Sequence, residues 1–131
     1  MDKAKQCAEY YAEKGEMDHS CPYKENYGED LGWESSSEGP PSKRLTTVKS
    51  IDDWYREYKD YNFEDPSVET GEVTGHFTQL LWKATEKTGI AAVQDDEKKT
   101  TYVVALFDPA GNVKVKSGDR FKYFKENVLL P

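Results

Sequence analysis

Two short apolar runs near the end of the chain constrain its fold more strongly than any other feature. Residues 89–94 (GIAAVQ) and 101–107 (TYVVALF) are apolar and rich in β-branched side chains, and the charged stretch DDEKKT separates them. This pattern is typical of an antiparallel β-hairpin. Since helical patterns come earlier in the chain, we expect an α+β fold in which helices flank a small antiparallel sheet of about three strands.

The first third of the chain has one helical and one extended segment. Residues 3–14 (KAKQCAEYYAEK) place their apolar side chains at helical spacing, and Gly15 follows as a C-terminal stop, so a helix is predicted. Residues 29–35 (EDLGWES) alternate apolar and polar side chains and are predicted to form a short strand. The Ser, Gly and Pro content of residues 34–44 (ESSSEGPPSKR) predicts a flexible surface linker.

Two further helices are predicted before the hairpin. One runs from about Ile51 to Tyr61, with Ser50 as its N-cap and two aspartates in its first turn, where carboxylates suit the helix dipole. Glu57 lies on the aromatic face of this helix, so its carboxylate is expected to be partly buried. The other helix covers residues 76–87 and ends before Gly89.

The length and charge of the chain exclude several classes of protein. A chain of 131 residues suffices for one hydrophobic core, so residues 1–131 are expected to form a single domain. The formal net charge of -7 opposes binding to phosphate backbones, and no nucleic-acid partner is expected. No apolar run approaches the ~18 to 20 residues that cross a bilayer, and the first twenty residues lack the apolar core of a signal peptide. We therefore expect a soluble chain.

The chain has two cysteines, Cys7 and Cys21. They could form one disulfide, but a chain with two cysteines is unlike the disulfide-dense secreted scaffolds. Free buried thiols are the expected state, and a Cys7–Cys21 bridge is the alternative.

Candidate chemistry rests on two histidines and two glutamates. His19 and His76 each lie where a predicted helix meets a loop, and histidine is the commonest metal ligand and the side chain that exchanges protons near neutral pH. Glu57 is a candidate buried carboxylate, and Glu29 begins the predicted strand. Spacing alone supplies no metal-binding or catalytic motif, so the alternative is that the histidines cap helices and Glu57 lies on a solvated face. A row of aromatic side chains is expected to pack in the core rather than to line a ligand groove: Tyr55, Tyr58, Tyr61 and Phe63.

Several segments resemble a known family. Residues 75–85 (GHFTQLLWKAT) and 102–113 (YVVALFDPAGNV) look like the two signatures of the CAP superfamily, the cysteine-rich secretory, antigen 5 and pathogenesis-related proteins, and they occur in the right order. Residues 19–21 (HSC), 27–33 (YGEDLGW) and 54–63 (WYREYKDYNF) agree with the same family. The chain resembles most closely the Golgi-associated plant pathogenesis-related branch. The resemblance implies an α-β-α sandwich.

The chain departs from the family pattern at three places. Ala105 stands where secreted relatives have a cysteine, which favours the cysteine-poor intracellular branch. Asp30 replaces the Asn of the family's GEN segment, so hydrogen bonding around Glu29 is expected to differ. The family's first helix is expected to be missing, which would leave apolar surface uncovered on one side of the sandwich and favour reduced stability or a homodimer.

The resemblance also implies a site and a function. The family's cavity residues correspond to His19, Glu29, Glu57 and His76, and in related proteins the two histidines bind a divalent ion, so zinc or another divalent cation is the implied cofactor. The implied function is binding of a sterol or other lipid, or interaction with proteins, near the loop before residue 76. The side chains expected to contact the lipid are Tyr58, Tyr61, Phe63 and Pro66.

Two alternatives stay open beside this binding module. One is a zinc-dependent hydrolase, a peptidase or esterase, in which Glu57 or Glu29 acts as general base on a metal-bound water. The other concerns location, which is the cytoplasm or the periphery of the Golgi membrane, or the extracellular space if an export signal has been removed. Peripheral contact with a membrane would use basic residues for which a solvated charged edge is the alternative: Lys114, Lys116, Arg120, Lys122 and Lys125.

Overall fold

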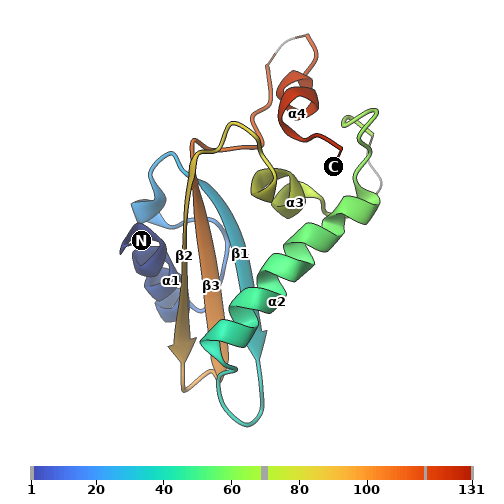
Figure 1. The fold of residues 1–131 in the computed structure, drawn as a ribbon. Coiled ribbons are helices and arrows are strands. Elements are labelled where there is room, and N and C mark those ends of the chain that lie inside the picture. The colour runs from blue at the N-terminus through green and yellow to red at the C-terminus, as the bar shows by residue number, and fades with distance from the viewer. Residues whose placement is uncertain (1, 69–70, 117, 131) are drawn as a thin grey trace.

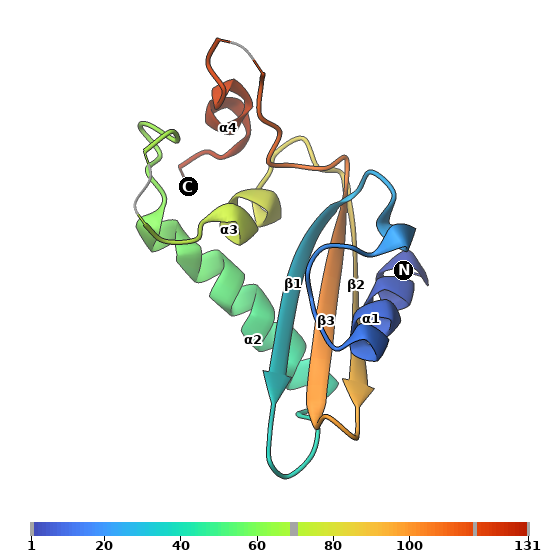
Figure 2. The ribbon, with the colours of Figure 1, turned by 180° about the vertical axis from the view of Figure 1, so that it is seen from behind.

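A three-stranded antiparallel sheet lies between one helix on one face and two helices on the other, and the fourth helix lies beyond one end of the sheet (Figures 1 and 2). The structure, a computed structural model, describes residues 2–68, 71–116 and 118–130. The strands are β1 (Gly28–Ser35), β2 (Lys87–Asp95) and β3 (Thr100–Asp108), and β3 lies between the other two. The helices are α1 (Asp2–Lys14), α2 (Lys43–Arg56), α3 (Gly75–Leu80) and α4 (Lys122–Asn127). None of the described helices is long and apolar enough to cross a membrane.

The layers confirm the predicted α-β-α sandwich and the predicted hairpin. Figure 2 shows α1 on one face of the sheet, while α2 and α3 lie on the other face. β2 and β3 pair antiparallel, with Asp95 opposite Thr100 at the turn. β1 pairs with the other side of β3, so both β1 and β2 are edge strands.

The central strand β3 supplies the core of both layers. Its side chains alternate between the two faces, as strand geometry requires. Val104 and Leu106 pack against the predicted inner face of α1, whereas Val103, Ala105 and Phe107 pack with Trp54 of α2. The inner face of α1 is buried as its spacing predicts: Ala4, Cys7, Ala8, Tyr11 and Ala12.

The start of α2 corrects the sequence prediction. Ser42 is the N-cap, since its hydroxyl accepts the backbone N–H of Leu45 at 3.3 Å, and part of the predicted linker is therefore helical. Ser50, predicted as the cap, lies in the middle of α2 and is buried. The helix ends at Arg56, and a short 3-10 turn, η2 (Glu57–Asp60), completes the segment that was predicted to be helical as far as Tyr61.

The predicted third helix is also shorter than expected. α3 ends at Leu80, and β2 has already begun at Lys87. The side chain and carbonyl of Asn127 take the backbone N–H groups that would continue the helix: Lys83 N–H donates to the Asn127 carbonyl at 3.0 Å, and Ala84 N–H donates to its Oδ1 at 2.9 Å. Trp82 then packs with Phe124 of α4, so tertiary contacts override the helical spacing.

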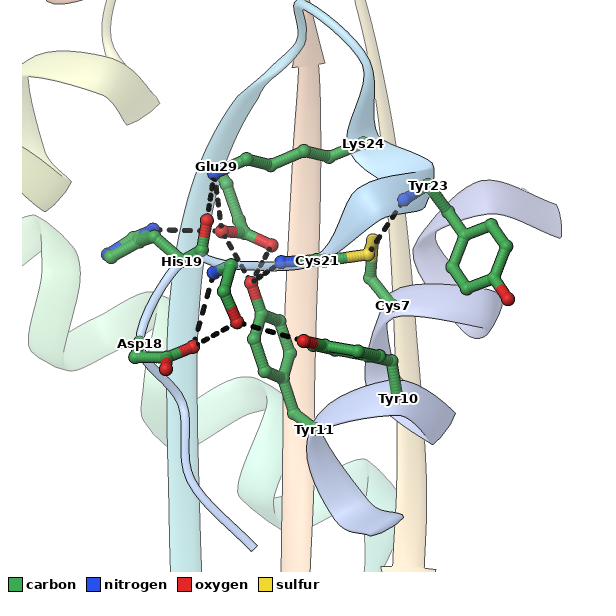
Figure 3. Close-up of a disulfide and its surroundings, with 10 residues drawn as sticks. Cys7, Tyr10, Tyr11, Asp18, His19, Cys21, Tyr23, Lys24 and Glu29 are labelled. Atoms are coloured by element: carbon green, nitrogen blue, oxygen red, sulfur yellow. Dashed lines mark hydrogen bonds and ion pairs between the residues drawn. A yellow bond between two sulfur atoms is a disulfide. The ribbon is translucent and has the colours of Figure 1, made fainter. Parts of the chain in front are cut away.

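The cysteines do not remain free thiols. Cys7 of α1 and Cys21 of the following loop form a disulfide, with their Cα atoms 5.5 Å apart. Both residues are buried, as predicted. The loop after α1 folds back along the helix and brings Cys21 next to Cys7 (Figure 3). The expectation of free thiols is wrong because composition does not report this return of the chain.

The contact between α2 and β1 requires Gly32. A Cβ atom at this position would lie 2.3 Å from Ser50 Oγ and 2.9 Å from Ser50 Cβ. We therefore expect Gly32→Ala to lower the free energy of unfolding by about 1–3 kcal/mol, through overpacking. Urea unfolding followed by circular dichroism measures the effect. Ser50→Ala, which removes the nearer atom, should restore part of the loss in the double variant, and an unchanged unfolding midpoint in Gly32→Ala would contradict this packing.

Candidate functional site

His19 and Glu29 form the first of two histidine–glutamate pairs (Figure 3). Nδ1 of His19 lies 2.8 Å from Oε1 of Glu29, the second residue of β1. The Glu29 side chain is 2% exposed, whereas the His19 side chain is 53% exposed. Figure 3 shows the imidazole extending past β1 on the side away from α1. The pair therefore combines an anchored carboxylate with an accessible ring.

α1 and the loop after it hold the Glu29 carboxylate in place. The Tyr11 hydroxyl lies 3.0 and 2.9 Å from the two carboxylate oxygens and accepts the backbone N–H of Cys21 at 3.1 Å. Lys24 Nζ lies 3.4 Å from Oε1 of Glu29 and also donates to the His19 carbonyl. Burial, and then the neighbouring Glu29 carboxylate, raise the pKa of Tyr11, so this hydroxyl remains a donor.

Asp18 stabilises the loop that carries His19 through hydrogen bonds. Its carboxylate accepts from the Lys14 ammonium at 2.5 Å and from the backbone N–H of Ser20 at 3.2 Å. The hydrogen bond from Lys14, and next the one from the Ser20 hydroxyl, lower the pKa of Asp18 to about 2. The backbone of His19 has a φ of 63°, in the left-handed region that residues other than glycine seldom adopt. The hydrogen bonds of Asp18 to Lys14 and Ser20 hold the loop on either side of it.

His76 and Glu57 form the second pair. Nδ1 of His76, in the first turn of α3, lies 2.7 Å from Oε2 of Glu57, and the other carboxylate oxygen accepts the Phe77 backbone N–H at 3.0 Å. The Glu57 side chain is 16% exposed, which confirms its predicted partial burial. The His76 ring stacks on Trp54 of α2, with 6.1 Å between ring centroids and 10° between planes. Both neighbours fix the orientation of the imidazole.

Asp30 carries a third carboxylate close to both pairs. It faces the α2 side of the sheet, is 2% exposed, and its Oδ2 has no hydrogen-bond partner among the described residues. Burial, followed by the carboxylates of Glu57 and Glu29, raises the pKa of Asp30 to about 9. Asp30 is therefore protonated and uncharged at neutral pH, as the Asn of the family pattern would be uncharged.

The two pairs share one chemical arrangement. Each glutamate forms a hydrogen bond with Nδ1 of its histidine, which leaves Nε2 as the nitrogen that could bind a metal. Histidines that bind metals commonly donate their other ring N–H to a carboxylate in this way. The four residues do not form one cluster, however. In residues 2–68, 71–116 and 118–130, no group of three or more His, Cys, Asp or Glu side chains could hold a metal ion. His76 and Glu57 line one hollow, which His19 and Glu29 do not line.

The predicted lipid-contacting residues gather around Phe77 of α3. The rings of Tyr58, Tyr61 and Phe63 lie 6.4, 5.7 and 5.9 Å from the Phe77 ring, centroid to centroid. Tyr55 joins them at 6.0 Å. Tyr61 and Phe63 pack against the buried cluster that contains Phe77, as expected of the aromatic row, whereas Tyr55 and Tyr58 are 44% and 41% exposed, so the expectation of core packing is wrong for these two. Phe77, which was not predicted as a site residue, is the ring that all four contact.

Part of this aromatic cluster also borders a hollow. Tyr61 and Pro66 line a cavity of about 370 Å³ between the loop before α3 and the segment before α4, with Lys114 and Phe121 on its other side. A smaller hollow of about 290 Å³ shares these four residues and reaches Phe124. Phe63 lines a separate hollow, and Tyr58, 41% exposed, lies outside both. The Tyr61 hydroxyl oxygen is buried without a hydrogen-bond partner among the described residues, and burial raises its pKa to about 12.

Tyr11 is a site residue that sequence reasoning did not single out. Its place on the buried face of α1 predicts core packing, and that packing is present. The hydrogen bonds to Glu29 and Cys21 carry no sequence signal, because the partners are eighteen and ten residues away along the chain. For Asp30, the departure from GEN to GED was the signal.

Similarity to characterised sequences covers most of the chain. The pattern of the CAP family, described as the cysteine-rich secretory protein family, matches residues 1–107. Human Golgi-associated plant pathogenesis-related protein 1 is 40% identical over 104 residues, which are 79% of this chain and 58% of that protein. Pathogenesis-related protein PR-1 of Medicago truncatula is 31% identical over 112 residues, 85% of this chain and 61% of that protein. The chain thus spans about three fifths of the length of these relatives.

Solved structures agree with the fold. BmVAL-1 matches with a TM-score of 0.65 and 23% identity, over 85% of this chain and 57% of that one. NaASP2, solved with Zn²⁺, matches with a TM-score of 0.64 and 23% identity, over 90% of this chain and 61% of that one. With the sequence match over residues 1–107, these likenesses show that the chain belongs to the CAP family of cysteine-rich secretory proteins.

Proposed function

We propose that this chain is a binding module for a sterol or a similarly flat lipid, held in the hollow beside Tyr61. The observation that carries the proposal is the Tyr61 hydroxyl, which is buried without a hydrogen-bond partner among the described residues, on a side chain that lines a cavity of about 370 Å³. A buried hydroxyl without a hydrogen bond costs free energy, and a ligand that supplies the missing partner recovers it. The volume lies within the roughly 300–1,000 Å³ of small-molecule sites.

The walls of the hollow favour an amphipathic ligand. Tyr61, Pro66 and Phe121 present rings or ring-like apolar surface, while Lys114, Asp60 and Glu72 place charged side chains at the same hollow. A sterol has a flat apolar body and one hydroxyl, which matches the single buried hydroxyl. A lipid with an anionic headgroup would instead use Lys114, so the two ligand classes place their polar groups on different residues.

Tyr61→Phe tests this proposal because it removes only the hydroxyl. We expect cholesterol to bind the variant roughly two- to tenfold more weakly than wild type, since a hydrogen bond is worth about 0.5–1.5 kcal/mol. 5α-Cholestane, which lacks the hydroxyl, should bind both proteins equally. The unliganded variant should unfold at a slightly higher temperature, because the unpaired buried hydroxyl is gone. Fluorescence competition and differential scanning calorimetry measure the two effects.

Matched controls separate the ligand classes. Tyr58→Phe removes a hydroxyl from the same aromatic cluster outside the hollow and should leave sterol affinity unchanged. Lys114→Gln should weaken binding to vesicles that contain phosphoinositide but leave cholesterol binding intact. If wild type binds neither cholesterol nor phosphoinositide vesicles above an unrelated acidic protein, the proposed function is wrong.

We also propose that His19 and His76 bind a divalent cation such as zinc through their Nε2 atoms. The support is the carboxylate on each Nδ1, at 2.8 and 2.7 Å, which is the arrangement that orients zinc-binding imidazoles. Zinc, when bound, would supply a Lewis acid. Glu29 and Glu57 already hold an imidazole each, so the geometry favours orienting roles for them over the general-base role of a hydrolase.

Zinc titration calorimetry tests whether the histidines act together. If one ion uses both rings, His19→Ala and His76→Ala should each lower zinc affinity about tenfold or more, and the double variant should add little. Glu57→Gln should weaken binding less than His76→Ala, since it loosens an imidazole without removing a ligand. Two independent weak sites, each lost with one histidine, would contradict a shared ion, and hydrolysis that depends on Glu57 would favour the enzyme instead.

A further inference from the structure

The outer edge of β1 is open for pairing at Trp33. β1 pairs with β3 in a register in which Ser36 N–H donates to the Lys99 carbonyl, so even-numbered residues of β1 bond to β3. The main-chain groups of odd-numbered residues therefore point away from the sheet, and the Leu31 carbonyl, which accepts from Trp54 Nε1 at 3.1 Å, confirms this direction. The next outward pair, the N–H and carbonyl of Trp33, has no hydrogen bond in the described part of the chain.

A hollow adjoins this edge on each face of the sheet. On the α2 face, a hollow of about 240 Å³ runs from Glu34 and Thr46 along α2 to Glu57 and His76. On the α1 face, a hollow of about 410 Å³ lies between Trp33, Met17 and Tyr102. Trp33 lines both hollows and is 63% exposed. A strand added at this edge would send alternate side chains into the two hollows.

The two hollows differ in charge. The α2-face hollow is lined by the carboxylates of Glu34, Asp53 and Glu57, against the Lys49 ammonium, which lies 3.1 Å from Glu34. The Thr46 hydroxyl, 1% exposed, lies at this hollow without a hydrogen-bond partner among the described residues. The α1-face hollow offers the Trp33 and Tyr102 rings and Met17, with the charged side chains of Glu16 and Lys98 also among its lining residues. A basic side chain suits the first hollow and an apolar side chain suits the second.

We propose that the outer edge of β1 binds an extended peptide in which basic and apolar residues alternate. Main-chain bonds to Trp33 supply affinity, and the two hollows supply specificity, as in other cases of strand addition. The apolar residue lies opposite Trp33 on the α1 face, and its basic neighbours lie opposite Gly32 and Glu34 on the α2 face. A second copy of this chain is disfavoured, because two copies that each carry a net charge of -7 repel one another. The proposal does not depend on lipid or metal binding.

Two N-methylated probes test the pairing. The parent probe is a fluorescent ten-residue peptide of alternating arginine and valine, blocked at both ends. In the predicted register the valine N–H groups face β1, whereas the arginine N–H groups point away. Methylation of the valine nitrogens should therefore weaken binding at least tenfold, and methylation of the arginine nitrogens should leave the affinity unchanged. Equal affinities for the two methylated probes, or no binding of the parent probe at millimolar concentration, would overturn the proposal.

Variants of the chain give an independent test. Trp33→Pro removes an N–H that points away from β3, so the hydrogen bonds between β1 and β3 are kept. Trp33→Ala loses only the ring. The parent probe should therefore bind Trp33→Pro about tenfold more weakly than it binds Trp33→Ala. Asp53→Asn should lower the affinity severalfold in low salt, whereas Glu86→Gln, an exposed carboxylate just before β2 at the opposite end of the sheet, should not. Should wild type instead form a dimer in sedimentation that Trp33→Pro abolishes, the edge belongs to a second copy and the peptide proposal is wrong. Should Trp33→Pro fail to fold, the methylated probes decide with wild type alone.

Discussion

Replacing Cys7 and Cys21 by alanine is expected to lower the free energy of unfolding by about 3 kcal/mol, the usual effect of opening a disulfide that closes a loop of this size. The two cysteines are separated by fourteen positions, and the loop between them carries His19. For a domain of this size the melting temperature should fall by roughly 10 °C. Calorimetry of the double variant, and of wild type with and without a thiol reductant, measures the change.

The same bond is expected to affect the first histidine–glutamate pair. Cys21 N–H donates to the Tyr11 hydroxyl, which in turn binds Glu29, so releasing Cys21 removes one of the contacts that hold the carboxylate. Amide exchange in residues 16–21 should become faster in the alanine variant, while exchange in β3 changes less. Tyr11→Phe, which keeps the disulfide, is the matched control for the hydroxyl alone. Complete alkylation of both cysteines in the folded, unreduced chain would contradict the disulfide.

The disulfide also bears on location. Disulfides persist in oxidising compartments and are rare in the cytosol. We therefore propose that the extracellular space suits the chain better than the cytoplasm, although the human relative is named as Golgi-associated. The Ala105 departure removes a different cysteine and does not argue against this bond.

Asp30→Asn is expected to stabilise the folded chain at neutral and alkaline pH. The folded-state pKa of Asp30, about 9, is higher than the ordinary value of 3.8 for an aspartate carboxyl. Stability from the protonated carboxyl is therefore complete below about pH 4 and is lost as the pH rises toward 9, by at most about 1.4 kcal/mol per pH unit. Asn stays neutral throughout, so the difference between variant and wild type should be small near pH 4 and reach about 2 kcal/mol or more by pH 8.

Urea unfolding of both proteins at several pH values between 4 and 9 measures this difference. Asp96→Asn, which changes an exposed carboxylate in the β2–β3 turn, is the control, and its difference in unfolding free energy from wild type should not grow with pH. In a Glu57→Gln background, the stability difference that Asp30→Asn makes should be smaller, because the Glu57 carboxylate is the charged neighbour that raises the pKa of Asp30 most. Parallel stability curves for wild type and Asp30→Asn would show that Asp30 is ionised in the folded state and would contradict the assignment.

Local pattern predicted the elements whose boundaries depend on nearby residues. The apolar face of α1 and the β2–β3 hairpin were predicted because their side chains repeat with the period of a helix or a strand. The boundaries that failed depend on distant partners. The sequence pattern places the cap at Ser50, yet Ser50 is buried against Gly32. α3 ends early because Asn127, more than forty residues later, accepts the backbone N–H groups of Lys83 and Ala84.

The sequence by itself determined the α+β class, the inner face of α1, the hairpin and, through its resemblance to a family, the four His and Glu residues. Only the tertiary structure decided that Cys7 bonds to Cys21, that His19 lies on Glu29 and His76 on Glu57, and that Asp30 is buried beside both carboxylates. Periodicity reports which side of an element is buried. It does not report the path of the chain between elements, and that path sets the distances on which bonds, ion pairs and pKa values depend.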